Sequence, residues 1–310
     1  MEKKISVIGA GNVGATTAHL LALKKLGDIV LFDIVEGMPQ GKALDISESS
    51  PIESFNSKVI GTNNYEETKD SDIVVITAGL PRKPGMSRDD LVEVNKKIVK
   101  EVTENVVKQS PNCILIIVSN PLDAMVYVAS EVSKFPKNRI IGMAGTLDSS
   151  RLRFFISQEL NISVDKIEAM VLGGHGDTMV PLISSAKVDG KPLSESLPKE
   201  KIDKLVERTQ KAGGEIVSLL KTGSAYYSTA SAINELVDSI VNDKKKILPC
   251  AAYLDGQYGV EGLFIGVPAK LGKVGIEQVI EAQLTDEEKK QFDITVQHVK
   301  ELTEKTKENL

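Results

Sequence analysis

The stretch KISVIGAGNVGATTAHLLALKK, residues 4–25, decides the fold class of this chain. Its first five residues form a short apolar run with β-branched side chains, which is typical of a buried strand. GAGNVG follows and has glycines with the G-x-G-x-x-G spacing, and the remainder is typical of a helix. The spacing alone is a weak signal, so the informative feature is its place between a strand and a helix.

Each glycine of this turn has a separate physical task. Gly9 permits the tight turn, Gly11 lets the backbone approach a pyrophosphate, and Gly14 lets the helix and the strand pack closely. The helix N-terminus offers unpaired N–H groups and a positive dipole end to the phosphates. The alternative is an ordinary glycine turn. We predict a dinucleotide-binding turn made by Gly9, Ala10, Gly11, Asn12, Val13 and Gly14.

Asp33 indicates which dinucleotide the turn binds. It ends the next strand-like run, IVLFD, at 29–33. A carboxylate at the end of this second strand suits the ribose hydroxyls of NAD. It would repel the 2′-phosphate of NADP, and no arginine follows to bind that phosphate, since Ile34, Val35 and Glu36 come next. We therefore predict NAD as the cofactor.

The first half of the chain repeats this alternation of strand and helix. Further strand-like runs lie at 58–62, 72–78, 113–119 and 139–143, and helix-like runs lie at 38–48 and 88–109. Alternating strands and helices favour βαβ units and a parallel sheet, and fully apolar strands fit a sheet covered on both faces. We predict an α/β fold in which residues 1–143 form a Rossmann-type, doubly wound NAD-binding domain.

The rhythm changes after residue 143. Longer helix-like runs lie at 147–159, 201–220 and 224–243, strand-like runs at 245–254 and 262–270, and a charged helix at 285–308. Because this half no longer alternates strand with helix, we predict a second α+β domain over residues 144–310. The candidate acid/base residue His175 lies in it, so we expect it to be the catalytic and substrate domain.

Composition excludes several classes of function. The net charge is −5 and the sequence contains no run of five or six like charges, so nothing favours binding to nucleic acid. The longest apolar runs, such as CILIIV at 113–118, have the length of a strand and not that of a membrane span. Cys113 and Cys250 lie far apart, outside any Cys/His cluster, so we expect buried thiols, no metal and a cytoplasmic protein.

His175 is the strongest candidate for acid/base chemistry. It lies in GGHGD, among glycines that let a ligand or another backbone approach closely, whereas the other two histidines lie in helix-like runs. A catalytic histidine needs an orienting partner, and Asp148 is a candidate. Arg151 follows three residues later, on the same helix face. The alternative for Asp148 and Arg151 is a surface ion pair.

Several motifs together resemble one family. GAGNVG with Asp33, GLPRKPGMSR, VSNP, LDSSR and GGHGD occur in this order, and the chain resembles the lactate/malate dehydrogenase superfamily of 2-hydroxyacid dehydrogenases from residue 4 to beyond 270. More narrowly, it is similar to the branch of lactate-dehydrogenase-like, NAD-dependent malate dehydrogenases. The resemblance implies reversible oxidation of (S)-malate to oxaloacetate, a step of the tricarboxylic acid cycle. It also implies a small-molecule substrate and a homodimer or homotetramer.

The resemblance also implies roles for individual residues. His175 would exchange the proton of the C2 oxygen, Asp148 would orient His175, and Arg151 would bind the C1 carboxylate. Arg88 would polarise the C2 carbonyl in the transition state. Asn120 would hydrogen-bond substrate and cofactor, in a turn that fits a cis Asn120–Pro121 bond. Asn95, Val118 and Asn120 would lie beside the cofactor.

Arg82 determines which acid the resemblance implies. Lactate dehydrogenases carry a glutamine at this place, and malate dehydrogenases carry an arginine that binds the second carboxylate. Burying that carboxylate without a partner is unfavourable, and pyruvate would leave the arginine itself unpaired. Two alternatives remain: a lactate or other 2-hydroxyacid dehydrogenase, and a non-catalytic NAD-binding sensor. The sensor is disfavoured because all of the implied catalytic residues are present.

Overall fold

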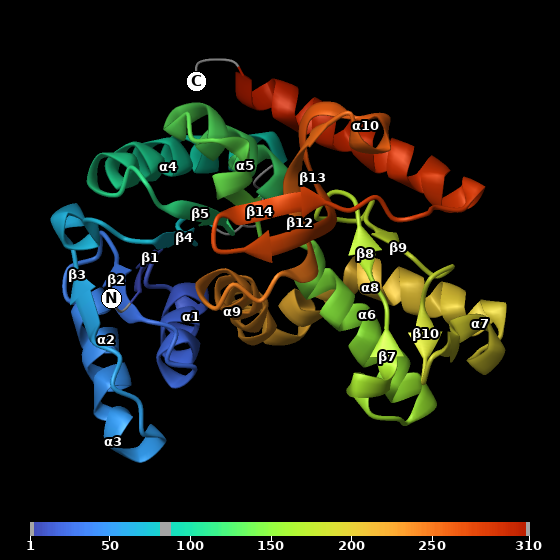
Figure 1. Ribbon diagram of the computed structural model, residues 1–310, viewed down its shortest axis with the longest axis horizontal. Coiled ribbons are helices and arrows are strands. Elements are labelled where there is room, and N and C mark those ends of the chain that lie inside the picture. The colour runs from blue at the N-terminus through green and yellow to red at the C-terminus, as the bar shows by residue number, and fades with distance from the viewer. Residues whose placement is uncertain (1–2, 81–87, 308–310) are drawn as a thin grey trace.

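The structure is a computed structural model that describes residues 3–80 and 88–307. Figure 1 shows a central sheet with helices above and below it, and a smaller lobe beside the sheet. Arg82 lies outside the described residues. Arg88 opens a helix, but its side chain also lies outside the described part.

Parallel strands in the order β3-β2-β1-β4-β5-β6 make up the first part of the sheet. This is the strand order of a Rossmann fold, as the alternation of strands and helices predicts. The order reverses between β1 and β4, where ligands of such sheets bind beyond the carboxyl ends of the strands. The strands are β1 Lys4–Ile8, β2 Asp28–Phe32, β3 Val59–Thr62, β4 Ile73–Ile76, β5 Ile114–Ile117 and β6 Ile140–Gly142.

Helices cover both faces of the sheet, because successive strand residues point to opposite sides. In β4, Ile73 and Val75 belong to the core on one face, and Val74 and Ile76 to the core on the other. In Figure 1, α4, α5 and α10 lie above the sheet, and α1 and α9 lie below it. The bounds are α1 Asn12–Leu23, α2 Met38–Glu48, α3 Ser50–Glu53, α4 Arg88–Gln109, α5 Leu122–Ser133, α9 Tyr227–Val241 and α10 Asp286–Lys307.

The second half of the chain extends the same sheet. Strands β12 (Lys246–Asp255), β13 (Glu261–Gly272) and β14 (Gly275–Val279) pair antiparallel with one another, and β12 pairs with β6 through Ala251 and Gly142. A Cβ on Gly142 would lie 2.7 Å from side-chain atoms of Ala251 and Val126, so glycine is required there. The sequence predicts the strands of β12 and β13 but not that they join the parallel sheet.

The remaining elements form the smaller lobe around α6 (Gly145–Leu160) and α8 (Lys199–Leu220). Leu152, Phe155 and Ile156 of α6 share a separate core with Ile202 and Leu205 of α8. The short elements around this core are β7 Ile167–Glu168, β8 Val171–Leu172, β9 Val180–Pro181, β10 Lys187–Val188, β11 Lys191–Pro192 and α7 Leu193–Ser196. Single 3₁₀ turns lie at Tyr65–Thr68, Lys137–Arg139, Val164–Lys166 and Gln257–Gly259.

In residues 3–80 and 88–307, no helix combines the length and the apolar character that a membrane crossing requires.

Candidate active site

The glycine turn lies at the switch point between β1 and β4. Gly9 has φ +105°, and a Cβ there would lie 2.7 Å from Thr77 Oγ1 at the end of β4. A Cβ on Gly14 would lie 1.8 Å from the Gly9 carbonyl oxygen, whereas one on Gly11 would meet no heavy atom within 4 Å. Gly9 and Gly14 therefore close the turn, and Gly11 leaves the open space that a dinucleotide needs for a close approach.

Asp33 follows β2 and reaches back to this turn. Its Oδ2 accepts the Ala10 N–H at 2.7 Å, and its Oδ1 accepts the Val35 N–H at 3.0 Å. Lys42 Nζ donates to the Ala10 carbonyl oxygen at 2.7 Å. The carboxylate thus shapes the glycine turn, and its contact with a ribose stays a prediction. Lys42 adds a positive charge that the sequence analysis missed. This donor and acceptor set fits NAD.

The segment after β5 lies across the switch point from Asp33. Val118 is buried, Asn120 is exposed, and the Asn120–Pro121 peptide bond is cis, which confirms the prediction. Asn95 of α4 is buried. Its Oδ1 accepts the Leu80 N–H at 2.8 Å, and its Nδ2 donates to the Leu80 and Asn120 carbonyl oxygens at 3.0 and 2.7 Å. Asn95 therefore ties together the segments after β4 and β5, and its contact with the cofactor stays a prediction.

His175, Asp148 and Arg151 lie together, as the sequence predicts. His175 Nδ1 lies 2.8 Å from Asp148 Oδ2, and Arg151 Nη1 donates to Asp148 Oδ1 at 3.1 Å. Asp148 lies in the first turn of α6 and is 2% exposed, so this is a buried contact and not a surface ion pair. The His175 side chain remains 19% exposed. Asp148 thus fixes the orientation of the ring and leaves Nε2 to exchange a proton.

The charges around His175 favour its protonated form. Burial disfavours a charged imidazole, but the Asp148 carboxylate, through its charge and its hydrogen bond, more than offsets this, so the pKa of His175 lies above its ordinary value. Arg151 opposes this shift, and the carboxylate of Asp123 adds to it. His175 therefore keeps its proton to a higher pH than an exposed histidine.

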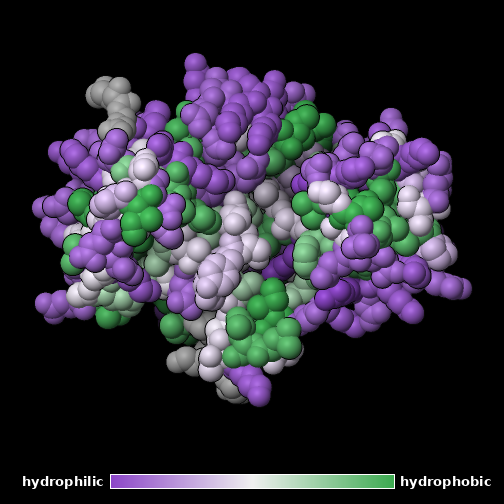
Figure 2. Space-filling model, turned by 90° about the horizontal axis from the view of Figure 1, so that it is seen from below, coloured by the Kyte–Doolittle hydropathy of each residue, from purple (hydrophilic) through white to green (hydrophobic). Residues whose placement is uncertain are grey.

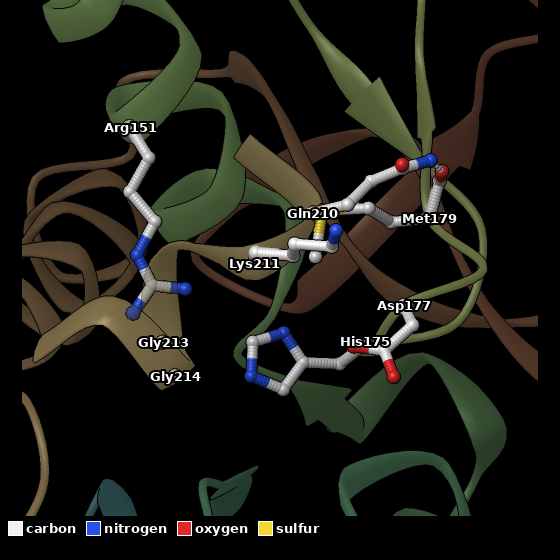
Figure 3. A pocket seen from close by; sticks show the side chains of 9 residues that line it. Arg151, His175, Asp177, Met179, Gln210, Lys211, Gly213 and Gly214 are labelled. Atoms are coloured by element: carbon white, nitrogen blue, oxygen red, sulfur yellow. Dashed lines mark hydrogen bonds between the residues drawn. The ribbon is translucent and has the colours of Figure 1, made fainter. Parts of the chain in front are cut away.

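A cavity of about 230 Å³ opens beside these residues. Figure 3 shows the Arg151 guanidinium and the His175 ring reaching into the same space from different elements. A Cβ on Gly213 of α8 would lie 3.9 Å from both Arg151 Nη atoms, which is ordinary van der Waals contact, so α8 packs beside the guanidinium. A planar cation beside a proton-exchanging ring suits a small acid. The sequence analysis missed the α8 part of the wall, Gln210, Lys211, Gly213 and Gly214.

Arg82 and the side chain of Arg88 lie outside the described residues, so their place in the site stays a prediction. Among the described residues, no three His, Cys, Asp or Glu side chains form a group that could hold a metal ion.

The sequence model of the lactate/malate dehydrogenase NAD binding domain matches residues 3–142, and that of the alpha/beta C-terminal domain of the same family matches residues 145–310. The chain belongs to the lactate/malate dehydrogenase family. It is therefore an NAD-dependent oxidoreductase, as the glycine turn and Asp33 predict.

Both malate dehydrogenases and lactate dehydrogenases of this family resemble the chain. A malate dehydrogenase of Bacillus israeli is 57% identical over 300 residues, which cover 96% of each chain. The crystal structure of Cryptosporidium parvum malate dehydrogenase matches with a TM-score of 0.97 and 47% identity over 99% of each chain. A lactate dehydrogenase of the same organism, complexed with lactic acid and nicotinamide adenine dinucleotide, matches with a TM-score of 0.97 and 42% identity, covering 100% of this chain and 99% of its own.

Proposed function

We propose that the chain is an NAD-dependent malate dehydrogenase, which interconverts (S)-malate and oxaloacetate. The observation that carries this proposal is the joint arrangement of His175, Asp148 and Arg151 at one cavity. The relative from Bacillus israeli, at 57% identity, supports malate over other 2-hydroxy acids.

We propose a separate task for each of the three side chains. Arg151 binds the C1 carboxylate of the substrate through its planar pair of donors. His175 takes the hydroxyl proton of malate at Nε2, or returns it to the carbonyl oxygen of oxaloacetate. Asp148 holds the ring and stabilises the imidazolium that forms. NAD, when bound, accepts or supplies the hydride at the substrate C2.

Two arginines outside the described side chains complete the proposal. Arg88, at the start of α4, polarises the C2 carbonyl in the transition state. Arg82 binds the second carboxylate of oxaloacetate or malate. Since pyruvate lacks this carboxylate, it would leave the guanidinium unpaired, so one residue rejects the smaller acid.

The direct test compares two keto acids with the unmodified protein. We expect kcat/KM for oxaloacetate to exceed that for pyruvate by roughly 10²-fold or more, because an unpaired buried charge costs about 3–5 kcal/mol. The measurement is NADH consumption at matched substrate concentrations. Equal efficiency with the two acids would refute malate as the substrate.

A lactate dehydrogenase is the second candidate, because the fold does not separate the two activities. The Cryptosporidium parvum lactate dehydrogenase matches as well in TM-score as the malate dehydrogenase of that organism. Preference for pyruvate in the same assay would favour this candidate. A non-catalytic sensor would bind NADH and turn over neither acid.

Asp33 supplies a test of the cofactor preference. We expect Asp33→Asn to raise KM for NADH by about tenfold, because hydrogen bonds to charged groups contribute roughly 1.5–3 kcal/mol. We also expect relatively better use of NADPH, since a neutral amide no longer repels the 2′-phosphate. Initial rates with both cofactors measure the change. Glu36→Gln, at an exposed acid in the same loop, is the matched control and should leave both values unchanged.

We propose that the chain divides functionally between residues 143 and 144, and the family matches, which end at 142 and resume at 145, support this division. We also propose a cytoplasmic enzyme, which the buried free cysteines Cys113 and Cys250 support.

We further propose a homodimer or homotetramer. In support, Figure 2 shows apolar side chains in separate patches on the face seen from below, and Ile52 and Leu219 are among the exposed apolar residues.

A further inference from the structure

The loop that carries His175 is held by three successive peptide N–H groups. Gly173 donates to the Gly266 carbonyl oxygen of β13 at 2.8 Å. Gly174 donates to Thr295 Oγ1 of α10 at 2.9 Å, and His175 donates to Asp123 Oδ2 of α5 at 2.9 Å. Three separate elements therefore anchor the loop. Of the three acceptors, only the Asp123 carboxylate, which accepts the His175 N–H, is ionisable.

Asp123 reaches this loop from the NAD-binding half of the chain. It lies in the first turn of α5, three residues after Asn120, and it is 4% exposed. A Cβ on Gly174 would lie 3.2 Å from Asp123 Oδ2 and 2.7 Å from Val299 Cγ2. The glycine thus lets the loop come close enough to α5 for the His175 hydrogen bond. One helical turn thereby connects Asn120, the predicted cofactor contact, with the catalytic loop.

Burying the Asp123 carboxylate costs free energy, because a charge is removed from water. An uncharged anchor of the loop would avoid this cost. Among the described residues, Asp123 Oδ1 has no hydrogen-bond partner. Burial raises the pKa of Asp123 to about 6, although the hydrogen bond from the His175 peptide opposes the rise. A serine or threonine hydroxyl could accept the one N–H without burying a charge. Costs of this kind concentrate at functional sites.

We propose that Asp123 is a positioning residue, which fixes the His175 peptide and adds a second buried negative charge near the imidazole that Asp148 orients. This inference rests on the proposed role of His175 as the proton donor to a keto acid. It does not depend on which keto acid the enzyme uses, so its test and the substrate test can fail separately.

Other charged groups that face His175 in the described part of the chain come from two helices and from its own loop. Asp148 and Arg151 belong to α6, Lys211 belongs to α8, and Asp177 lies in the loop that carries His175. Arg151, Lys211 and Asp177 also line the cavity. From α10, Thr295 contributes an uncharged hydroxyl to this loop. Asp123 is ionised above about pH 6, so it carries its charge where a histidine with a raised pKa loses its proton.

The test measures how kcat/KM of the Asp123→Asn variant depends on pH. The reaction is reduction of the keto acid that the wild-type enzyme uses most efficiently. The carboxamide oxygen can still accept the His175 N–H, but the charge is gone. Reduction needs protonated His175, so the rate falls as pH rises through the pKa of that residue. We expect this high-pH limb to move to lower pH by roughly 0.5 to 1 unit. NADH binding should stay within about threefold of wild type.

Thr295→Val is the matched control, because it removes the neighbouring anchor of the same loop without removing a charge. We expect it to lower kcat and leave the limb in place. An Asp123→Asn profile that coincides with wild type, or that copies Thr295→Val, overturns the proposal. Should Asp123→Asn fail to fold, Asp123→Ser, which leaves room for a water, undergoes the same comparison with the same criteria.

Discussion

His175→Asn is expected to lower kcat for oxaloacetate reduction by about 10²- to 10⁴-fold, the usual contribution of a general acid. Asparagine retains a side-chain amide that can contact Asp148, but it cannot supply a proton. NADH binding should stay near wild type, because the glycine turn and Asp33 lie in the other half of the chain. Stopped-flow mixing and NADH fluorescence titration measure the two properties separately.

His298→Asn is the control for this substitution, since it removes a histidine of α10 that does not line the cavity. It should keep wild-type turnover. A His175→Asn enzyme that loses less than about tenfold would require another proton donor, and the sign of the pH dependence argued for Asp123 would then lose its basis.

Arg82→Gln is expected to change the ratio of kcat/KM for oxaloacetate to that for pyruvate by about 10²- to 10⁴-fold in favour of pyruvate. The reason is that removing one partner of a buried charge pair costs about 3–5 kcal/mol. Turnover of oxaloacetate should fall, because its second carboxylate loses its partner. Bound pyruvate should no longer leave a guanidinium unpaired. Rates with both acids at several concentrations give the ratio.

Lys83→Gln is the matched control, because it removes one positive charge from the neighbouring position in the sequence. We expect it to leave the ratio unchanged. If Arg82→Gln leaves oxaloacetate turnover intact, Arg82 does not discriminate the substrates, and the malate assignment would rest on the relatives alone.

The features that could be predicted are those that local sequence encodes. The glycine turn needs glycine at fixed positions, and the structure shows why: a Cβ on Gly9 or Gly14 would collide with neighbouring atoms. The pairing of His175 with Asp148 is non-local; the residues alone made Asp148 a candidate, and the occurrence of GGHGD and LDSSR together in one family supported it. Arg151 followed from its spacing to Asp148.

The features that were missed depend on tertiary contacts. α5 was not predicted, because most of LDAMVYVASEVS is buried and apolar residues surround the helix instead of forming one stripe. Without α5 there was no reason to notice Asp123. The α8 wall of the cavity gave only a weak signal, the adjacent Gly213 and Gly214 within a helical run. The joining of β12 to β6 is a strand pairing between distant segments, which no local pattern reports.

The pairing of β6 with β12 also limits how this enzyme can diverge. Cutting the chain near residue 143 would leave an unpaired strand edge on each piece, and such edges promote aggregation. An exchange of halves between relatives must also keep glycine at 142, with small and matching side chains at Ala251 and Val126. We therefore expect the two halves to be inherited as one unit. On the same grounds, we expect new substrate preferences to arise through point substitutions at the site and not through recombination at the apparent boundary.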